Sequence, residues 1–343
     1  MKLEIQRRTL TLARPLETSY GAVRERELLF VTITGPDGIP GYGEAAPLEA
    51  YDGVSLDRVQ RALERYAPVL ADAEAMNGAQ LIEACRRVED LPAAFAAIDL
   101  ALWDRAGRRS GRPVASMISD DPAPSVPVNA TLSALDRAGA AEQAARAVRD
   151  GFTCLKVKVG VGDDAGRVAA TRAAAGPQTA LRLDANGAWD VEEAVASIEA
   201  LSPAGLELVE EPTHGLHGVR EIRERVAVRV AIDETAGELG ALTAGVADAV
   251  CLKISRCGGI GGLVAAATLV RSTGAEVYLA STLDGPIGVA AAVHVAAALA
   301  SRGPMPHCGL ATLAMFEDLD DPLPARAGAI AVPTAPGLGV EPL

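Results

Sequence analysis

Charged side chains recur at nearly even spacing through the middle of the chain, each at the end of a short apolar run. They are Lys158, Asp184, Glu210, Asp233 and Lys253, and successive members are 26, 26, 23 and 20 positions apart. A single charge after a strand is usually a helix cap or an exposed rim residue. Five in register indicate a functional site, because a buried strand end tolerates charge only when that charge is paired or metal-bound.

Three of these residues are carboxylates on successive runs. If the runs are neighbouring parallel strands, Asp184, Glu210 and Asp233 converge at one edge of the sheet. Oxygen donors without histidine or cysteine suit a hard cation, so the pattern predicts one Mg²⁺ ion, with Mn²⁺ as an alternative. Further polar groups stand next to these residues and are expected to support them: Asn186, Glu211 and Glu234.

The two lysines indicate the type of reaction. On opposite sides of an eight-stranded barrel, Lys158 and Lys253 would flank a substrate carboxylate bound to the cation. The proton next to a carboxylate is very weakly acidic, and a divalent cation stabilises the enediolate left after its removal. The nearby charge of Lys156 would favour the neutral, basic form of Lys158. The pattern therefore predicts an enzyme in which a lysine removes a proton alpha to the carboxylate of a small substrate.

Short apolar runs alternate with alanine-rich helical patterns from residue 126 onward. Eight runs of strand length occur: VPVNAT, CLKVKVG, ALRLDA, LELVEEP, VRVAIDE, AVCLKIS, EVYLAS and, more weakly, MPHCGL. Helices are expected to begin near Asp136, Asp163, Val191, Gly218, Glu238, Ile260 and Ile287. This alternation predicts an α/β fold, a (β/α)8-type barrel over residues 123–321, with catalytic groups at the carboxyl ends of its strands. An open doubly wound sheet is the alternative, but no GxGxxG opens a helix after the first strand.

The first 122 residues have a different pattern. LEIQRRTLTL and ELLFVTITG alternate as strands do, and PDGIPGYGEAAP supplies turn residues. Helical stretches follow from Ser55 to about Arg87 and from Pro92 to about Arg108. Strands followed by helices predict an N-terminal α+β capping domain over residues 1–122, which the Pro/Gly-rich segment 322–343 is expected to complete.

Composition argues against several classes of function. The 343 residues carry a formal net charge of −13, so nucleic-acid binding through a basic face is not expected. The first residues lack the apolar core of a signal peptide, and the longest apolar-rich stretch, residues 285–300, is too short to span a bilayer. No membrane partner is therefore expected. The five cysteines form no CxxC pair, which argues against a disulfide framework or a zinc site and favours a reducing cytoplasm.

Several motifs extend this pattern into a family resemblance. They are KVKVG (156–160), RLDANGAW (182–189), VEEP (209–212), IDET (232–235), LKISRCGGI (252–260) and, near the N-terminus, GYGEAAPL (41–48). With these motifs the chain resembles the muconate-lactonising subgroup of the enolase superfamily. The resemblance implies that the three carboxylates bind Mg²⁺, that the lysines at 158 and 253 are catalytic with support from Lys156, and that the protein is a homo-oligomer. Four histidines have no expected catalytic role: His214, His217, His294 and His307.

Three activities of this subgroup compete. The stretches VPVNAT (126–131), RLDANGAWD (182–190), STLDGPIG (281–288) and CGLAT (308–312) are most similar to o-succinylbenzoate synthases, which catalyse a dehydration. The KISRCGGI motif is closer to epimerases and lactonising enzymes, so dipeptide epimerase, N-acylamino acid racemase and muconate cycloisomerase remain alternatives. We favour the synthase. A non-catalytic barrel that only binds ligands would be expected to lose the charged site residues first, and all of them are present.

Substrate contacts are expected from two regions. The resemblance implies a mobile loop of the capping domain, here residues 18–26, and contacts from the ends of the seventh and eighth strands. The candidates in these regions are Tyr20, Arg24, Arg26, Ser281 and Asp284. Dipeptide epimerases also hold the substrate ammonium with an Asp-x-Asp pair after the last strand, and here that pair would be Asp318 and Asp320.

Overall fold

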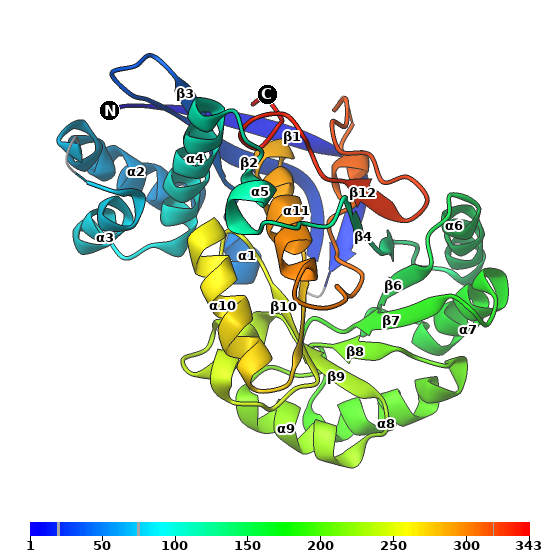
Figure 1. Cartoon of the computed structure of the whole chain (residues 1–343). Helices are drawn as coiled ribbons and strands as arrows, with labels where there is room; N and C mark the ends of the chain where they lie inside the picture. Colours follow the sequence, from blue (N-terminus) through cyan, green and yellow to red (C-terminus); the bar gives the residue numbers. More distant parts are fainter. Residues whose placement is uncertain (19–20, 74–75, 318) are drawn as a thin grey trace.

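The computed structural model describes residues 1–18, 21–73, 76–317 and 319–343. Its N-terminal part is a three-stranded antiparallel sheet in the order β1-β2-β3, formed by β1 (Lys2–Thr18), β2 (Gly21–Thr34) and β3 (Pro40–Ala45). The helices of this part are α1 (Glu49–Asp52), α2 (Leu56–Ala71), α3 (Gly78–Val88), α4 (Pro92–Ser110) and α5 (Val114–Ile118). In Figure 1 this cap lies above and to the left of the barrel strands.

Between Leu28 and Val31 the central strand of the cap, β2, is buried on both faces. Leu29 and Val31 belong to the core formed with the helices, which also contains Tyr66. Leu28 and Phe30 belong to the core of the barrel. Since successive side chains of a strand point to opposite faces, this one strand contributes to both hydrophobic cores and fixes the cap on the barrel.

The structure divides the expected helical stretch from Ser55 to Arg87 into two helices. Ser55 starts α2 by accepting the N–H of Arg58. A capping box between Asn77 and Gln80 starts α3. Because an asparagine in this position satisfies backbone donors at a helix start, it favours a new helix rather than continuation of the first.

Seven parallel strands form the second sheet, in the order β11-β10-β9-β8-β7-β6-β5. They are β5 (Ala130–Leu132), β6 (Cys154–Lys158), β7 (Ala180–Asp184), β8 (Leu208–Glu210), β9 (Arg229–Ile232), β10 (Ala249–Leu252) and β11 (Glu276–Leu279). The weak eighth run, MPHCGL, closes the sheet through isolated bridges instead of a strand. Cys308 bridges Val128 next to β5, and Gly309 bridges Ala280 next to β11. The predicted (β/α)8-type barrel with an N-terminal α+β cap is confirmed.

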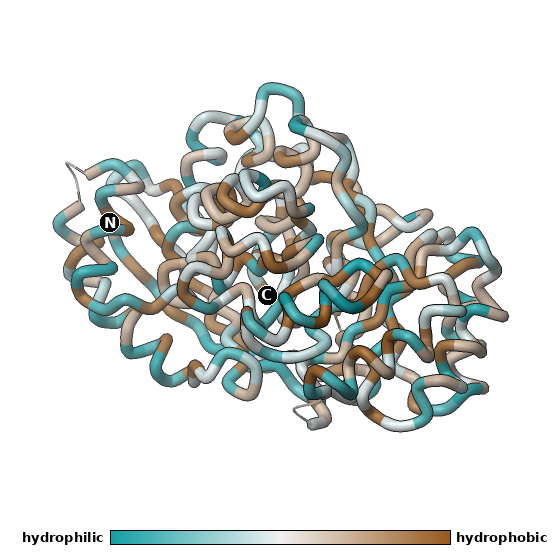
Figure 2. Tube along the Cα trace, turned by 90° about the horizontal axis from the view of Figure 1, so that it is seen from below, coloured by the Kyte–Doolittle hydropathy of each residue, from teal (hydrophilic) through white to brown (hydrophobic). Residues whose placement is uncertain are grey.

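Helices follow most of the barrel strands and cover them from outside (Figure 1). They are α6 (Arg137–Arg149), α7 (Asp164–Ala175), α8 (Val191–Leu201), α9 (Leu216–Arg225), α10 (Ile260–Ser272) and α11 (Pro286–Ala300), with a short 3₁₀ helix, η2 (Ser202–Ala204), after α8. Asp136, Asp163 and Asp190 cap α6, α7 and α8 by accepting backbone N–H groups. Hydrophilic and hydrophobic residues alternate along the outer helices (Figure 2), as expected when one face packs on the strands.

The prediction of a helix near Glu238 is wrong. Two short 3₁₀ helices, η3 (Glu234–Gly237) and η4 (Ala241–Thr243), follow β9 instead. Gly240 and Gly245 have φ angles of +83° and +61°. These left-handed values are not compatible with a continuous α-helix. The glycine-rich sequence TAGELGALTAG therefore replaces the expected helix with short turns.

Helix α11 is apolar on all sides and packs against α5 and β3 of the cap. His294 lies within it and is fully buried. Its Nδ1 accepts the N–H of Ala115 at 3.1 Å, so its Nε2 donates to the carbonyl of Leu338, also at 3.1 Å. Burial lowers the pKa of His294 to about 4, which keeps the ring neutral. Within the described part of the chain, no helix combines the length and apolar character needed to cross a membrane.

The C-terminal segment returns to the earlier part of the chain. After η5 (Leu313–Met315), strand β12 (Ala329–Ala331) pairs antiparallel with β4 (Ser125–Pro127). The N–H of Leu338 donates to Asp104 of α4 at 2.7 Å. All five cysteines are free. The division at residues 122 and 321 remains a prediction: the C-terminal segment contacts the predicted barrel domain through β4 and the cap through Asp104.

Glu44 of β3 ties the cap to α11. Its carboxylate accepts the N–H groups of Gly285 and Gly288, at 2.6 and 3.3 Å. A Cβ at Gly288 would lie only 3.0 Å from Glu44 Oε1, so glycine permits this close approach. The N-cap residue Gly285 has no side chain to cap the helix. The Glu44 side chain, supplied by the other domain, therefore accepts N–H groups that the start of the helix leaves unpaired.

This buried carboxylate should make the stability of the protein depend on pH. Burial, with a further effect of the Asp284 charge, raises the pKa of Glu44 from 4.5 to about 8. The folded state then holds the proton more tightly than the unfolded state. The resulting stabilisation is fully present below about pH 4.5 and is lost as the pH rises towards about 8.

We therefore expect the free energy of unfolding of the wild type to fall relative to that of Glu44→Gln between about pH 5 and about pH 8. The uncharged glutamine does not titrate, so the difference between the two proteins isolates this one carboxyl group. Urea unfolding of both proteins at several pH values measures it. Parallel pH profiles would contradict the expectation.

Candidate active site

The strand ends bring the three predicted carboxylates close together. In the sheet register, Lys158 pairs with Asp184 and Asp184 pairs with Glu210, while Asp233 follows directly after β9. The exposed fractions of Asp184, Glu210 and Asp233 are 1%, 0% and 4%. Three buried anions are unfavourable unless cations compensate them. The next question is therefore which cationic side chains pair with these carboxylates.

Two lysines of β6 reach the first two carboxylates. Lys156 Nζ lies 2.9 Å from Asp184 Oδ2 and 3.1 Å from Glu210 Oε1. Lys158 Nζ donates to Asp184 Oδ2 at 2.6 Å and to Asn186 Oδ1 at 2.7 Å. Residues two positions apart on a strand share a face. Both amines therefore enter the barrel interior from the same strand.

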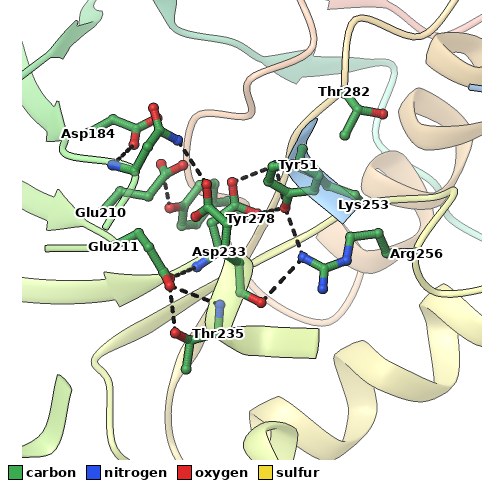
Figure 3. A network of polar contacts seen from close by, with 12 residues as sticks. Tyr51, Asp184, Glu210, Glu211, Asp233, Thr235, Lys253, Arg256, Tyr278 and Thr282 are labelled. Carbon is green, nitrogen blue, oxygen red and sulfur yellow. Dashed lines mark hydrogen bonds and ion pairs between the residues drawn. The ribbon is translucent and has the colours of Figure 1, made fainter. Parts of the chain in front are cut away.

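Lys253, four strands away after β10, is held by the third carboxylate and by a tyrosine of the cap (Figure 3). Its Nζ pairs with Asp233 Oδ2 and donates to Tyr51 Oη at 2.8 Å. Tyr51 Oη donates in turn to Asp233 Oδ1 at 2.7 Å and accepts from Arg256 Nη1 at 3.0 Å. The Lys253 ammonium also lies 4.0 Å from the centre of the Tyr51 ring, a favourable cation–π distance.

Tyr51 and Arg256 are site residues that the sequence pattern did not single out. Arg256 lies within the LKISRCGGI motif, so its place beside Lys253 was a usable signal. Tyr51 comes from α1 of the cap and lies outside the barrel spacing. Only its position just after GYGEAAPL could have drawn attention to it.

The expected supporting residues contact the cluster. Glu211 accepts the N–H groups of Asp233 and Thr235 at 2.8 and 2.9 Å, which fixes the backbone around the third carboxylate. Asn186 Nδ2 donates to Glu234 Oε1 at 3.0 Å. Asn186 and Glu211 have φ angles of 45° and 41°. Non-glycine residues keep such values only where their surroundings hold them, and this occurs most often at functional sites.

Burial and charge together set the protonation of the cluster. Burial lowers the pKa of Lys156, but Asp184 and Glu210 outweigh it, so this pKa lies above its usual range. Burial raises the pKa of Asp184, yet the lysines hold it well below its usual range. Burial, followed by the adjacent charge of Asp184, raises the pKa of Glu210. A divalent cation would therefore stabilise above all the charged form of Glu210, which burial and Asp184 disfavour.

The donor set fits a hard divalent cation. Asp184, Glu210 and Asp233 offer carboxylate oxygens from neighbouring strand ends, the type of ligand that Mg²⁺ prefers. One oxygen each of Glu210 and Asp233 lies within 4.8 Å of Cys251 Sγ, a neighbour that the sequence pattern did not identify. Burial raises the pKa of the Cys251 thiol well above its ordinary value, so it stays protonated and is a poor ligand. Glu210 and Asp233 are therefore close enough to share one ion, and Asp184, which Lys156 and Lys158 hold, would complete the ligand set.

A cavity of about 100 Å³ lies between these groups and the cap. Lys158, Asp184, Asp233 and Lys253 line it on the barrel side. Much of the remaining wall is apolar or carries hydroxyl groups: Leu16, Val23, Leu48, Thr131, Ser281, Thr282, Thr312 and Met315. Of the predicted substrate contacts, Ser281 is therefore placed at the cavity.

Two other predicted substrate contacts lie between the domains instead. Arg26 is buried and donates to the carbonyls of Ala46 and Pro47, both at 2.9 Å. Asp284 is buried and accepts from Thr282 Oγ1 at 2.9 Å. Neither lines the cavity. Arg26 thus bonds within the cap and Asp284 within the barrel, and their opposite charges attract each other across the boundary between the two parts.

Two of the remaining predicted contacts, Arg24 and Asp320, are not brought into the cavity. Arg24 and Asp320 are exposed. Tyr20 and Asp318 lie outside the described residues. From Gly21 onward, the segment that the family resemblance assigned to a loop is part of β2. The sequence alternation of β2 thus extends further towards the hairpin end than the resemblance implied.

Comparison with known families agrees with this geometry. Residues 2–119 match the mandelate racemase / muconate lactonizing enzyme N-terminal domain, and residues 139–343 match the enolase C-terminal domain-like family. Together these matches span nearly the whole chain. The chain belongs to the enolase superfamily, in its muconate-lactonising subgroup.

Individual relatives have different activities. The chain is 29% identical over 309 residues to a hydrophobic dipeptide epimerase of Enterococcus faecalis, covering 87% of this chain and 86% of that one. It is 40% identical over 218 residues to an o-succinylbenzoate synthase of Thermobifida fusca, covering 59% and 66%. A solved structure of the Enterococcus faecalis V583 dipeptide epimerase, complexed with Mg and L-Leu-L-Tyr, is similar with a TM-score of 0.88. It is 28% identical, and the match covers 99% of each chain.

The converging carboxylates predict divalent-cation binding that depends on Glu210. We expect the substrate-free protein to bind one Mn²⁺ or Mg²⁺ per chain, and Glu210→Gln to weaken binding at least about ten-fold by removing an anionic ligand. Glu192→Gln is the matched control, because Glu192 is an exposed carboxylate that pairs with Arg225. Isothermal titration calorimetry measures each dissociation constant. Equal affinities for Glu210→Gln and the wild type would exclude this ligand set.

Proposed function

We propose that the protein is a Mg²⁺-dependent enzyme that removes the proton alpha to a substrate carboxylate, with Lys158 as the base. One observation carries the proposal: the amines of Lys158 and Lys253 line the same cavity as buried carboxylates, from strands on opposite sides of the barrel. A divalent cation bound by the carboxylates would stabilise the negative charge that develops on the substrate during this reaction.

The residues of the chain supply the positioning and the proton transfer. Asp184 and Asn186 orient the Lys158 amine by accepting hydrogen bonds from it. In its neutral form this amine takes the proton from the carbon next to the carboxylate. Lys253, held by Asp233 and Tyr51, presents a fixed positive charge to the same space from the other side.

Among the reactions open to this site, we favour dehydration of the o-succinylbenzoate synthase type. The proton leaves to Lys158, the carbon–oxygen bond of the substrate hydroxyl breaks, and a carbon–carbon double bond and water result. The identity to the synthase relative supports this choice.

Epimerisation of dipeptides is the second candidate. It requires removal of a proton from one face of a carbon and its return to the other. Lys158 and Lys253 approach the cavity from opposite sides and meet that requirement. The similarity to the epimerase structure, which extends over the whole chain, also supports it.

The synthase assignment predicts fast turnover of the o-succinylbenzoate synthase substrate in the presence of Mg²⁺. We expect the ultraviolet absorbance of the substrate to fall with the enzyme and Mg²⁺. It should stay constant when EDTA removes the metal, because the metal is then no longer there to stabilise the negative charge that develops on the substrate. The assay is a continuous absorbance measurement. Absence of turnover with bound Mg²⁺ would reject the synthase and favour the epimerase.

Proton transfer by Lys158 is tested with whichever substrate the wild type turns over. We expect Lys158→Ala to lower kcat by at least about a thousand-fold, because the amine that is proposed to take the proton is removed. Lys2→Ala, which changes an exposed lysine far from the site, should match the wild type. Mass spectrometry in D₂O with dipeptides and N-acylamino acids reports exchange as a gain of about one dalton. Catalysis by Lys158→Ala at the wild-type rate would reject the mechanism.

A further inference from the structure

We propose that Tyr278 of β11 is a positioning residue that sets the affinity of the site for its divalent cation by orienting Glu210. The inference rests on the proposed function, in which Glu210 is a metal ligand. Tyr278 Oη donates to Glu210 Oε2 at 2.8 Å, from across the barrel interior (Figure 3). Tyr278 is 2% exposed and Glu210 is fully buried, so water does not replace this contact.

The two donors to Glu210 act on it differently. Lys156 Nζ lies 3.1 Å from Oε1 and 3.3 Å from Oε2, so it spans both oxygens. Such a contact fixes where the carboxylate lies but leaves its rotation weakly defined. Tyr278 contacts Oε2 alone and therefore fixes the rotation. Mg²⁺ demands nearly ideal octahedral geometry, so the direction in which a ligand oxygen points affects binding directly.

Tyr278 is itself held rigidly. The guanidinium of Arg182 lies 5.0 Å from the centre of its ring. Arg182 is fully buried and donates to Glu207 Oε2 at 2.7 Å and to the carbonyl of His307 at 2.6 Å. A buried arginine is costly unless its donors are satisfied, and these partners satisfy it. Arg182 therefore links its own strand, β7, to Tyr278 on β11 and to the segment that closes the barrel.

The alternative is that Tyr278 only fills the barrel core, and Tyr66 provides the comparison. Tyr66 is also fully buried, and its hydroxyl donates to the carbonyl of Glu89 at 2.6 Å. It lies in the core of the cap, away from the carboxylates. Replacing either tyrosine with phenylalanine removes one buried hydroxyl group. Only the replacement of Tyr278 changes a contact to Glu210.

The test is a titration of the whole, substrate-free chain with Mn²⁺, with free Mn²⁺ followed by electron paramagnetic resonance. We expect Tyr278→Phe to raise the dissociation constant about ten- to a hundred-fold, the usual effect of losing a residue that orients a metal ligand. Tyr66→Phe should leave it unchanged. Arg182→Lys keeps the charge but loses the planar fork that clamps the ring, so it should also raise the dissociation constant.

Three results would overturn the proposed role of Tyr278, and a fourth would reject the proposed function. A dissociation constant for Tyr278→Phe within about two-fold of the wild type would overturn it, because ligand-orienting residues have larger effects. Equal weakening in Tyr66→Phe would overturn it as well, since the effect would then be general loosening. Should Tyr278→Phe not fold, Arg182→Lys decides, and an unchanged constant there overturns the proposal. A wild-type chain that binds no Mn²⁺ would instead reject the proposed function.

Discussion

Burial of three carboxylates at one end of a parallel barrel is the constraint on which the rest of this structure depends. Asp184, Glu210 and Asp233 are almost inaccessible to water, and isolated anions would not be stable there. Lysines from β6 and from the end of β10 compensate them directly. The arrangement keeps oxygen donors and amines around one cavity, which is what proton abstraction next to a carboxylate requires.

The cap is part of this site and not only a cover. Tyr51 contacts both Lys253 and Asp233, so the barrel alone would leave a buried amine and a carboxylate without one partner each. Glu44 caps the buried helix α11 from the other domain. That helix begins just after the segment that carries Ser281, which lines the cavity. Docking of the cap and formation of the substrate space are therefore linked by the same polar contacts.

The sequence predicted the barrel and the charged cluster well, for a simple reason. Strand-length runs separated by helical patterns specify parallel strands, and the carboxyl ends of such strands meet at one edge. The prediction from sequence failed for two individual elements of the barrel. The helix expected near Glu238 is replaced by turns because of left-handed glycines. The eighth strand is reduced to isolated bridges that close the barrel. Domain boundaries, ligand roles and substrate contacts remain predictions.

The sequence by itself therefore determined the class of fold and which charges share the barrel mouth, because strand spacing alone sets both. Only the tertiary structure decided which distant residues complete the site. Tyr51 reaches Asp233 across 182 positions of sequence, and Tyr278 reaches Glu210 across 68. Likewise, the family resemblance placed Arg26 in a mobile loop, but the structure buries its side chain. No periodic pattern encodes such contacts, since they depend on how the cap sits on the barrel and how side chains fill its interior.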